Sequence, residues 1–302
     1  MINDVSLHPQ NCRIDQVIAL SKFHTTVDVL RLDLIHPVIS GNKWFKLKEY
    51  LDEAKQANKK IIASFGGAYS NHIIATAAAA KASGLKSIGI IRGEKPTTFS
   101  HTLTDAVQFG MKLYFISRKD YKEKNVPQEV FEDCNKNSIY FIKEGGYGKK
   151  GAEGAKQILQ LTDTSKYTHI IAAVGTGTTL AGLIESAQPY QEITGISVLK
   201  NNFSLAEEIK NLLPEAKKNR FTLIHDYHFG GYAKYTTELI RFMNNWYHQT
   251  GIPSDFVYTG KLFFAVNDLI EKKYFPPESK LLIIHSGGLQ GNRSLPNGTL
   301  IF

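Results

Sequence analysis

Residues 61–83 read IIASFGGAYSNHIIATAAAAKAS, and this stretch decides the fold class. An apolar run from Ile61 to Phe65 ends in the pair Gly66-Gly67, and an alanine-rich helical pattern follows from Asn71 to Ser83. An apolar run with little polar alternation is typical of a strand that is covered on both faces, as in parallel α/β sheets. The stretch therefore predicts a buried parallel strand, a tight turn and a helix.

The same alternation of strands and helices continues along most of the chain. Further strands are expected at 87–91, 112–116, 138–142, 169–174, 192–198, 221–224 and 280–284, and further helices at 152–161, 235–248 and 261–269. The pattern predicts two doubly wound parallel-sheet lobes, with a ligand in the crevice at the carboxyl ends of the strands. We expect a large unit from residues 1–50 and 140–302 and a small α/β unit from 51–139. The segment 121–137 fits either a polar helix or a loop.

Composition narrows the class of protein. A content of 42% hydrophobic and 21% charged residues is ordinary for a soluble globular enzyme. No apolar run approaches the roughly 18 residues of a membrane helix, and residues 1–5 do not resemble a secretory signal. Cys12 and Cys134 match no metal-ligand spacing and are expected to be reduced thiols. We therefore expect a cytoplasmic protein with no membrane partner and no metal site.

The formal net charge of +8 raises the question of a nucleic-acid partner. The lysines occur mostly as short pairs such as Lys59-Lys60 and Lys149-Lys150, without a continuous basic arm or an RNA-binding motif. A solvated basic surface explains this distribution better than a nucleic-acid interface does. We expect no nucleic-acid partner, although the charge would also attract anionic ligands.

Two short segments carry groups suited to carbonyl chemistry. Lys43 follows the bend Gly41-Asn42, and Ser70-Asn71 stand where the helix after Gly66-Gly67 begins. A helix N-terminus offers unpaired N–H groups and a positive dipole end, which suit a carboxylate or a phosphate. An amine in the same pocket could react with a carbonyl of the substrate or of pyridoxal phosphate (PLP). A solvated Lys43 and a simple helix cap at Ser70 remain open alternatives.

A third segment, Gly175-Thr176-Gly177-Thr178-Thr179, follows an apolar strand and opens a helix. Small residues let the backbone approach a phosphate, and the N–H groups and hydroxyls can bind its oxygens. An ordinary strand-to-helix turn is the alternative. No lysine follows the glycines as in a P-loop, and the third glycine of the dinucleotide fingerprint is replaced by Leu180.

Five motifs together resemble the 1-aminocyclopropane-1-carboxylate (ACC) deaminase/D-cysteine desulfhydrase family of PLP enzymes. They are Ser40-Gly41-Asn42-Lys43, Gly66-Gly67 with Ser70-Asn71-His72, Gly175 to Thr179, Val257-Tyr258-Thr259-Gly260-Lys261 and His285-Ser286-Gly287-Gly288. They lie in the family's order and span nearly the whole chain. The resemblance implies a tryptophan-synthase-β-like fold (PLP fold type II) with the PLP site between the lobes. It also implies a small amino-acid substrate and a homodimer.

The resemblance assigns roles to individual residues. Lys43 matches the lysine that holds PLP and moves the substrate's α-proton. The turn Ser70-Asn71-His72 matches the one that grips the substrate carboxylate, and Gly175 to Thr179 match the phosphate cradle. The catalytic residues that it implies are Lys43, Ser70, Tyr232 and Tyr258, and the cofactor-binding residues are Lys43, Lys46, Asn71, Gly175, Thr176, Gly177, Thr178, Thr179, Tyr258 and Thr259.

Thr259 bears most on the reaction type. The resemblance places Glu here in ACC deaminases and Thr in desulfhydrase-like members, in each case facing the pyridine nitrogen of PLP. A hydroxyl that donates to an unprotonated nitrogen makes a weaker electron sink, which suffices for β-elimination but not for opening a cyclopropane. The implied activity is β-elimination like that of D-cysteine desulfhydrase, which yields pyruvate, ammonia and sulfide. ACC deamination and PLP binding without turnover remain open, as does a helix-capping role for Thr259.

The chain also departs from the family's pattern. Phe45 replaces a basic residue common in the Lys43 motif, and Ile73-Ile74 stand where members often have Arg. The segment 93–100 is shorter than its counterpart, so part of the wall around the substrate differs. These departures leave the cofactor assignment intact and the identity of the substrate open.

Overall fold

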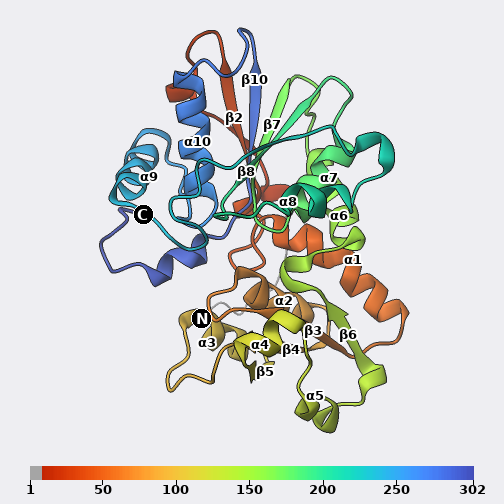
Figure 1. Ribbon diagram of the computed structural model, residues 1–302. Helices are drawn as coiled ribbons and strands as arrows, with labels where there is room; N and C mark the ends of the chain where they lie inside the picture. Colours follow the sequence, from red (N-terminus) through yellow and green to blue (C-terminus); the bar gives the residue numbers. More distant parts are fainter. Residues whose placement is uncertain (1–8) are drawn as a thin grey trace.

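The strands build two separate, largely parallel sheets in the computed structural model, which describes residues 9–302 (Figure 1). The smaller sheet has the order β5-β4-β3-β6 with every pair parallel, and the larger has the order β1-β2-β10-β7-β8-β9 with only β1 antiparallel. The strands are β1 (Ile14–Gln16), β2 (Thr26–Arg31), β3 (Ile61–Gly66), β4 (Lys86–Arg92), β5 (Met111–Ile116), β6 (Ile139–Ile142), β7 (His169–Val174), β8 (Glu192–Ser197), β9 (Thr222–Ile224) and β10 (Lys280–His285). The expected α/β class with two parallel lobes is confirmed.

Helices connect the strands and cover both sheets. The α-helices are α1 (Asn42–Gln56), α2 (Asn71–Ala82), α3 (His101–Gln108), α4 (Arg118–Glu123), α5 (Gln128–Asp133), α6 (Lys149–Lys156), α7 (Thr178–Ser186), α8 (Leu205–Lys210), α9 (Thr237–Thr250) and α10 (Thr259–Glu271). Short 3₁₀ helices occupy Pro9–Asn11, Ile18–Leu20, Leu32–Leu34, Lys136–Ser138, Glu144–Gly146, Gln157–Gln160, Glu215–Lys217 and Leu289–Ser294. The segment 121–137, which the sequence leaves open, therefore contains the end of α4, all of α5 and the start of a 3₁₀ turn.

Strand β3 is buried along its whole length, as its apolar run predicts. Ile61, Ala63 and Phe65 pack into one hydrophobic cluster, while Ile62 packs into another together with Ile74 of α2. Since side chains alternate across a strand, these clusters lie on opposite faces of the small sheet. Burial on both faces explains why the run lacks polar residues.

Strands β1 and β2 were not among the expected strands. β2 carries Asp28 and Arg31, two charges that hide its apolar alternation in the sequence. In the fold, Asp28 accepts hydrogen bonds from Tyr167 (2.6 Å) and Lys166 (2.9 Å), and Arg31 pairs with Asp33 at 2.6 Å. Because the charges are paired across the fold, β2 can lie inside the larger sheet.

Helix α1 lies between the two lobes (Figure 1). Leu47 and Leu51 pack in the cluster that contains Ile62 of the small sheet, whereas Phe45 packs in the main core of the larger sheet. One helix thus contributes to both cores. The expected unit boundary between residues 139 and 140 stays a prediction, while strand β6, which crosses it, pairs with β3 in the small sheet.

Glycines let α1, α6 and α7 approach closely. A Cβ atom at Gly154 of α6 would lie 1.9 Å from the carbonyl oxygen of Phe45, and one at Gly182 of α7 would lie 2.5 Å from Cβ of Ala155. Both distances are far below a van der Waals contact, so the helix backbones touch at these points. This close packing holds α1, and with it the Lys43 segment, against the larger lobe.

We predict that Gly154→Ala destabilises the protein, even though alanine is better than glycine in a helix by about 1 kcal/mol. The added methyl group has no room beside Phe45, and overpacking typically costs about 1–3 kcal/mol. The midpoint of urea unfolding, followed by circular dichroism, should fall. The exposed neighbour Glu153→Ala is the matched control and should leave the midpoint almost unchanged. Equal midpoints for Gly154→Ala and the wild type would contradict the close contact.

Candidate active site

A cavity of about 790 Å³ opens where strands of both sheets end at their carboxyl termini. Its lining includes Gly67 after β3, Arg92 at the end of β4, Gly175 after β7 and Ser286 after β10. Carboxyl ends of parallel strands are the usual place for a ligand in such folds. The crevice that the strand pattern predicts is therefore present.

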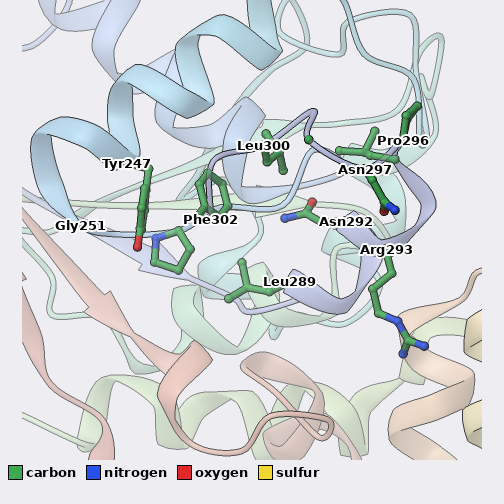
Figure 2. Close-up of a pocket in the computed structure, with 12 residues that line it drawn as sticks. Tyr247, Gly251, Leu289, Asn292, Arg293, Pro296, Asn297, Leu300 and Phe302 are labelled. Carbon is green, nitrogen blue, oxygen red and sulfur yellow. The ribbon is translucent and has the colours of Figure 1, made fainter.

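A second cavity of about 740 Å³ lies between the end of α9 and the C-terminal segment (Figure 2). Tyr247 and Phe302 pack on its wall with ring centroids 4.6 Å apart and ring planes tilted by 39°, and Arg293 lies at its edge. None of the residues that the sequence predicts for the site lines this cavity. The chemistry-bearing residues gather in the first cavity, which we call the interlobe cavity.

Lys43 lies in the first turn of α1 and lines the interlobe cavity. Its Nζ donates a hydrogen bond to Oδ1 of Asn42 (2.7 Å) and lies 5.7 Å from the ring centroid of Tyr258. Burial lowers the pKa of Lys43 to about 8, although the nearby carboxylate of Asp255 opposes the shift. Lys43 is therefore not a solvated surface lysine. About a tenth of the Lys43 side chains is then neutral, and so nucleophilic, at pH 7, far more than for an exposed lysine.

The bend before Lys43 is pressed against the segment that follows β10. Gly41 has φ of +64°, and a Cβ atom there would lie 1.8 Å from the carbonyl oxygen of Ser286. The N–H of Asn42 donates to that same oxygen at 3.3 Å, and Ser40 Oγ accepts from the N–H of Gly288 at 3.3 Å. Only glycine fits this contact and this backbone angle. The first motif, Ser40 to Lys43, and the last motif, His285 to Gly288, are thus in direct contact, and this contact positions Lys43.

Lys46 lies one turn further along α1 and is buried. Its Nζ donates to the carbonyl oxygen of Gly145 at 2.6 Å, and burial together with the charge of Lys43 holds its pKa well below the ordinary value. Two amines in one cavity repel each other. A bound anion would relieve that repulsion, so the pair fits a phosphate.

The segment Gly175 to Thr179 lines the cavity at the start of α7. Gly177 has φ of +79°, and Asn42 Nδ2 donates to Oγ1 of Thr179 at 2.7 Å. A Cβ atom at Gly175 would lie 3.3 Å from Cε1 of Tyr258, so glycine lets the backbone of the segment lie close to the Tyr258 ring. The free N–H groups of the first helical turn therefore face a cradle that suits a phosphate.

Ser70 caps α2, as its residue type predicts, by accepting a hydrogen bond from the N–H of Ile73 at 3.3 Å. Asn71 is buried beside it and lines the cavity. Its Nδ2 donates to the carbonyl oxygen of Gly288 at 3.5 Å, but its Oδ1 has no hydrogen-bond partner. An unpartnered buried oxygen is costly for the free protein and so marks a place where a ligand can bind.

The hydrogen bonds around His72 define its protonation. Ser64 Oγ donates its proton to a hydrogen bond with the carbonyl oxygen of Ile142 at 2.8 Å, so it accepts a hydrogen bond from the Nε2–H of His72, also at 2.8 Å. Nδ1 is then the bare nitrogen, and it has no partner. Burial and the charges of Lys46 and Lys43 hold the pKa of His72 well below its usual value. The neutral ring offers an acceptor to the cavity, so a carboxylate at this turn has the backbone N–H groups and the Ser70 hydroxyl as its donors.

Tyr232 and Tyr258 both line the cavity. Their rings meet edge to face, with centroids 6.2 Å apart at an angle of 73°. Burial raises the pKa of Tyr258 well above its ordinary value, so its hydroxyl stays protonated. The two rings form an aromatic wall opposite Lys43 and leave the phenol groups as hydrogen-bond donors.

Thr259 is the one expected site residue that the structure does not bring to the cavity lining. It is fully buried, and its hydroxyl donates to Oδ1 of Asp255 at 2.8 Å and accepts the N–H of Asp255 at 2.7 Å. The single proton of the hydroxyl is therefore committed to a carboxylate. A donor role of Thr259 toward a ring nitrogen requires this bond to break.

Asp255 is a buried carboxylate that the sequence did not single out. Besides the Thr259 hydroxyl, it accepts the N–H groups of Val257, Tyr258 and Thr259, each at 2.9 Å. It thus caps α10, where a cap by Thr259 was the alternative expectation. In the sequence, the signal for this cap was an acidic residue, Asp255, four positions before the first residue of the helix, Thr259. Arg92, Glu144 and Ser286 also line the cavity without having been named as site residues.

The fold and the site together define an enzyme that uses PLP. An amine with a lowered pKa faces one helix N-terminus, and a second amine and a glycine-rich cradle suit a phosphate ester. The chain belongs to the pyridoxal-phosphate dependent enzyme family, whose model matches residues 13–287. PLP is therefore its cofactor.

Individual relatives place the chain among deaminases and desulfhydrases. A putative 1-aminocyclopropane-1-carboxylate deaminase of Pyrococcus horikoshii is 29% identical over 88% of this chain and 85% of its own length. A D-cysteine desulfhydrase of Klebsiella pneumoniae is 26% identical over 86% of each chain. The crystal structure of an ACC deaminase homologue superposes with a TM-score of 0.82 at 29% identity, covering 95% of this chain and 92% of the other. The expected type II PLP fold is confirmed.

Two classes of feature are absent from the part of the chain that the structure describes. No helix within residues 9–302 is long and apolar enough to cross a membrane. The same residues contain no group of three or more His, Cys, Asp or Glu side chains that could hold a metal ion.

We predict that Lys43 in PLP-free protein reacts with an amine reagent with a midpoint near pH 8. The neutral amine is the reactive form, so labelling rises with pH through the pKa, whereas exposed lysines titrate near 10.4. Peptide mass spectrometry of acetylated protein across pH 6–11 measures the midpoint at each lysine. A midpoint for Lys43 close to that of exposed lysines would contradict its burial.

The same measurement tests the influence of Asp255. Its carboxylate raises the pKa of Lys43 against the effect of burial, so Asp255→Asn should move the Lys43 midpoint to lower pH. Asp268→Asn, which removes a carboxylate further along α10, should leave it in place. A rise in the midpoint for Asp255→Asn would show that the carboxylate acts through something other than its charge.

Proposed function

We propose that the protein is a PLP-dependent lyase that removes the α-proton of a small amino acid and eliminates a group from its β-carbon. In the D-cysteine desulfhydrase-like form of the reaction, D-cysteine and water yield pyruvate, ammonia and sulfide. The observation that carries the proposal is the Lys43 amine, whose pKa is lowered to about 8 in a cavity that also contains a helix N-terminus. Bound PLP supplies an electron sink for the electron pair left by the departing proton.

The chain's own groups divide into two sets in this proposal. Lys46 and the cradle Gly175 to Thr179 hold the phosphate through charge and backbone N–H groups. Nδ2 of Asn71 binds the phenolic oxygen of the cofactor, which requires Nδ2 to leave its long bond to Gly288. The aromatic wall of Tyr232 and Tyr258 packs against the ring.

The substrate is held on the other side of the cavity. Its carboxylate binds the backbone N–H groups and the Ser70 hydroxyl at the start of α2, while Lys43 accepts the α-proton. The buried imidazole of His72 belongs to the same turn, where it stays neutral, lines the cavity and is held by Ser64. Exclusion of water by the cavity wall favours the neutral form of Lys43 and so its action as a base.

ACC deamination is the second candidate, and one observation favours it. The Thr259 hydroxyl donates its proton to Asp255, so its oxygen can offer the ring nitrogen only a lone pair and no proton. The Asp255 carboxylate lies directly behind that oxygen. That arrangement would favour a protonated ring nitrogen and a stronger electron sink. The presence of Thr259 therefore weighs less against cyclopropane opening than its residue type alone indicates.

We also propose a cytoplasmic homodimer. The two cysteines, Cys12 and Cys134, are free thiols, which supports a reducing compartment. The homodimer rests on the family resemblance. Sedimentation equilibrium tests the dimer directly.

A product screen tests the function. PLP-loaded protein is incubated with paired D- and L-amino acids and with ACC, and keto acid and sulfide are measured. D-cysteine should yield pyruvate and sulfide, and Lys43→Ala should lower the rate by about 10²–10⁴-fold or more, since loss of a general base costs about that much. Lys48→Ala is the matched control, because Lys48 lies on the same helix, does not line the cavity and bonds Gln157.

Two outcomes contradict the proposal in different ways. Release of 2-oxobutanoate from ACC at a rate equal to any thiol elimination would replace β-elimination with ACC deamination. PLP binding without keto acid from any compound tested would leave a binding protein rather than a lyase.

A further inference from the structure

We propose that Arg92 selects amino acids whose side chains carry a second negative charge. The inference rests on the proposed function in one respect, namely that the interlobe cavity receives an amino acid. It adds a substrate class, an amino acid with an acidic side chain, and a specificity-determining residue that the sequence did not single out.

Arg92 is placed where a substrate side chain would extend. It ends β4, lines the interlobe cavity and lies beside the turn that leads to Ser70. Its Nη2 lies 3.7 Å from the position that a Cβ atom would take on Gly67. Gly67 therefore leaves open the space in front of the guanidinium group. A ligand seated at the start of α2 has Arg92 as its cationic neighbour.

The guanidinium group is held in position by an aromatic ring rather than by an acid. Its Cζ lies 5.6 Å from the ring centroid of Tyr121, a buried residue of α4. No carboxylate of residues 9–302 lies within ion-pair distance of Arg92, and no hydrogen bond within this range involves its side chain. Arginine presents five N–H donors in a planar fork that matches a carboxylate or a phosphate. Those donors remain available to a ligand.

The charges of the cavity assign Arg92 to the substrate rather than to the cofactor. In the proposed function, Lys43 acts on the α-carbon, Lys46 holds the phosphate and the start of α2 holds the α-carboxylate. The acidic residue on the cavity wall, Glu144, is already paired with Lys124 at 2.5 Å. Arg92 is then the cation left without an anion, and the substrate side chain is the group that reaches it.

The surroundings of Arg92 support the same assignment. Arg92 is exposed at the cavity mouth, and Gly93, the next residue, has φ of +105°. A Cβ atom on Gly93 would meet no atom within 4 Å, so the space beyond Arg92 is open. That space leaves room for a side chain that ends in an acidic group.

Aspartate and asparagine are the probes that isolate the charge, because they have nearly the same shape. Isothermal titration calorimetry of PLP-loaded protein measures their dissociation constants, with both enantiomers of each. The wild type should bind one enantiomer of aspartate more tightly than the matching asparagine. Arg92→Gln should reduce that preference by about 10- to 100-fold, which is the range expected for a charged hydrogen-bonded pair. Arg92→Lys should retain part of it, since the charge stays and the fork is lost.

Lys86→Gln is the matched control. It removes one positive charge from the opposite, exposed end of the same strand, so it should leave the preference unchanged. Equal weakening of aspartate and asparagine by Arg92→Gln would overturn the proposal, because Arg92 would then serve the α-carboxylate or the fold. Equal binding of the two probes by the wild type would overturn it as well.

The binding measurement separates this inference from the proposed function. A preference for aspartate that disappears in Arg92→Gln, in a protein that releases no keto acid from any amino acid, would uphold Arg92 and reject the lyase. Elimination from D-cysteine by a protein that binds aspartate and asparagine equally would support the lyase and reject the role of Arg92.

Discussion

The structure depends on the burial of two amines, Lys43 and Lys46, in one cavity. Burial lowers the pKa of both amines, and the charge of Lys43 lowers the pKa of Lys46 further. The start of α2 and the start of α7 add the positive ends of two helix dipoles to the same space. The cavity is therefore strongly electropositive, and a ligand with several negative charges stabilises it. PLP with an amino acid supplies a phosphate and a carboxylate, which is what this arrangement requires.

The fold supports that arrangement through a few close backbone contacts. The bend at Gly41 touches the carbonyl oxygen of Ser286, so the segment that follows β10 fixes where α1 begins. Gly154 then lets α6 pack directly on the turn that contains Phe45. Because α1 also contributes Leu47 to the core of the small lobe, both lobes fix the direction in which Lys43 points. Asp255 is the buried anion that balances part of the charge, and it does so while capping α10.

Much of this could be predicted from the sequence. The apolar runs at β3 and β7 end in glycines and open helices, and that local pattern predicted the crevice in which the cavity lies. The family resemblance named the site residues, and twelve of them line the cavity. Strand β2 escaped prediction because its charges, Asp28 and Arg31, are paired by residues distant in sequence or outside the strand. The protonation of His72 depends on Ser64 and on the carbonyl of Ile142, which only the folded sheet brings together. The Thr259 hydroxyl was expected at the cavity, but a cap four residues earlier holds it.

The central claim is that Lys43, and not another buried amine, binds the cofactor. Lys46 shares the cavity, and Lys261, whose pKa burial lowers to about 8, lies nearby on α10. Borohydride reduction of PLP-loaded protein fixes the cofactor to the lysine that carries it. Peptide mass spectrometry then identifies that lysine. The account predicts one modified peptide, the one that contains Lys43. Modification of Lys46 or Lys261 instead, or no modification at saturating PLP, would contradict it.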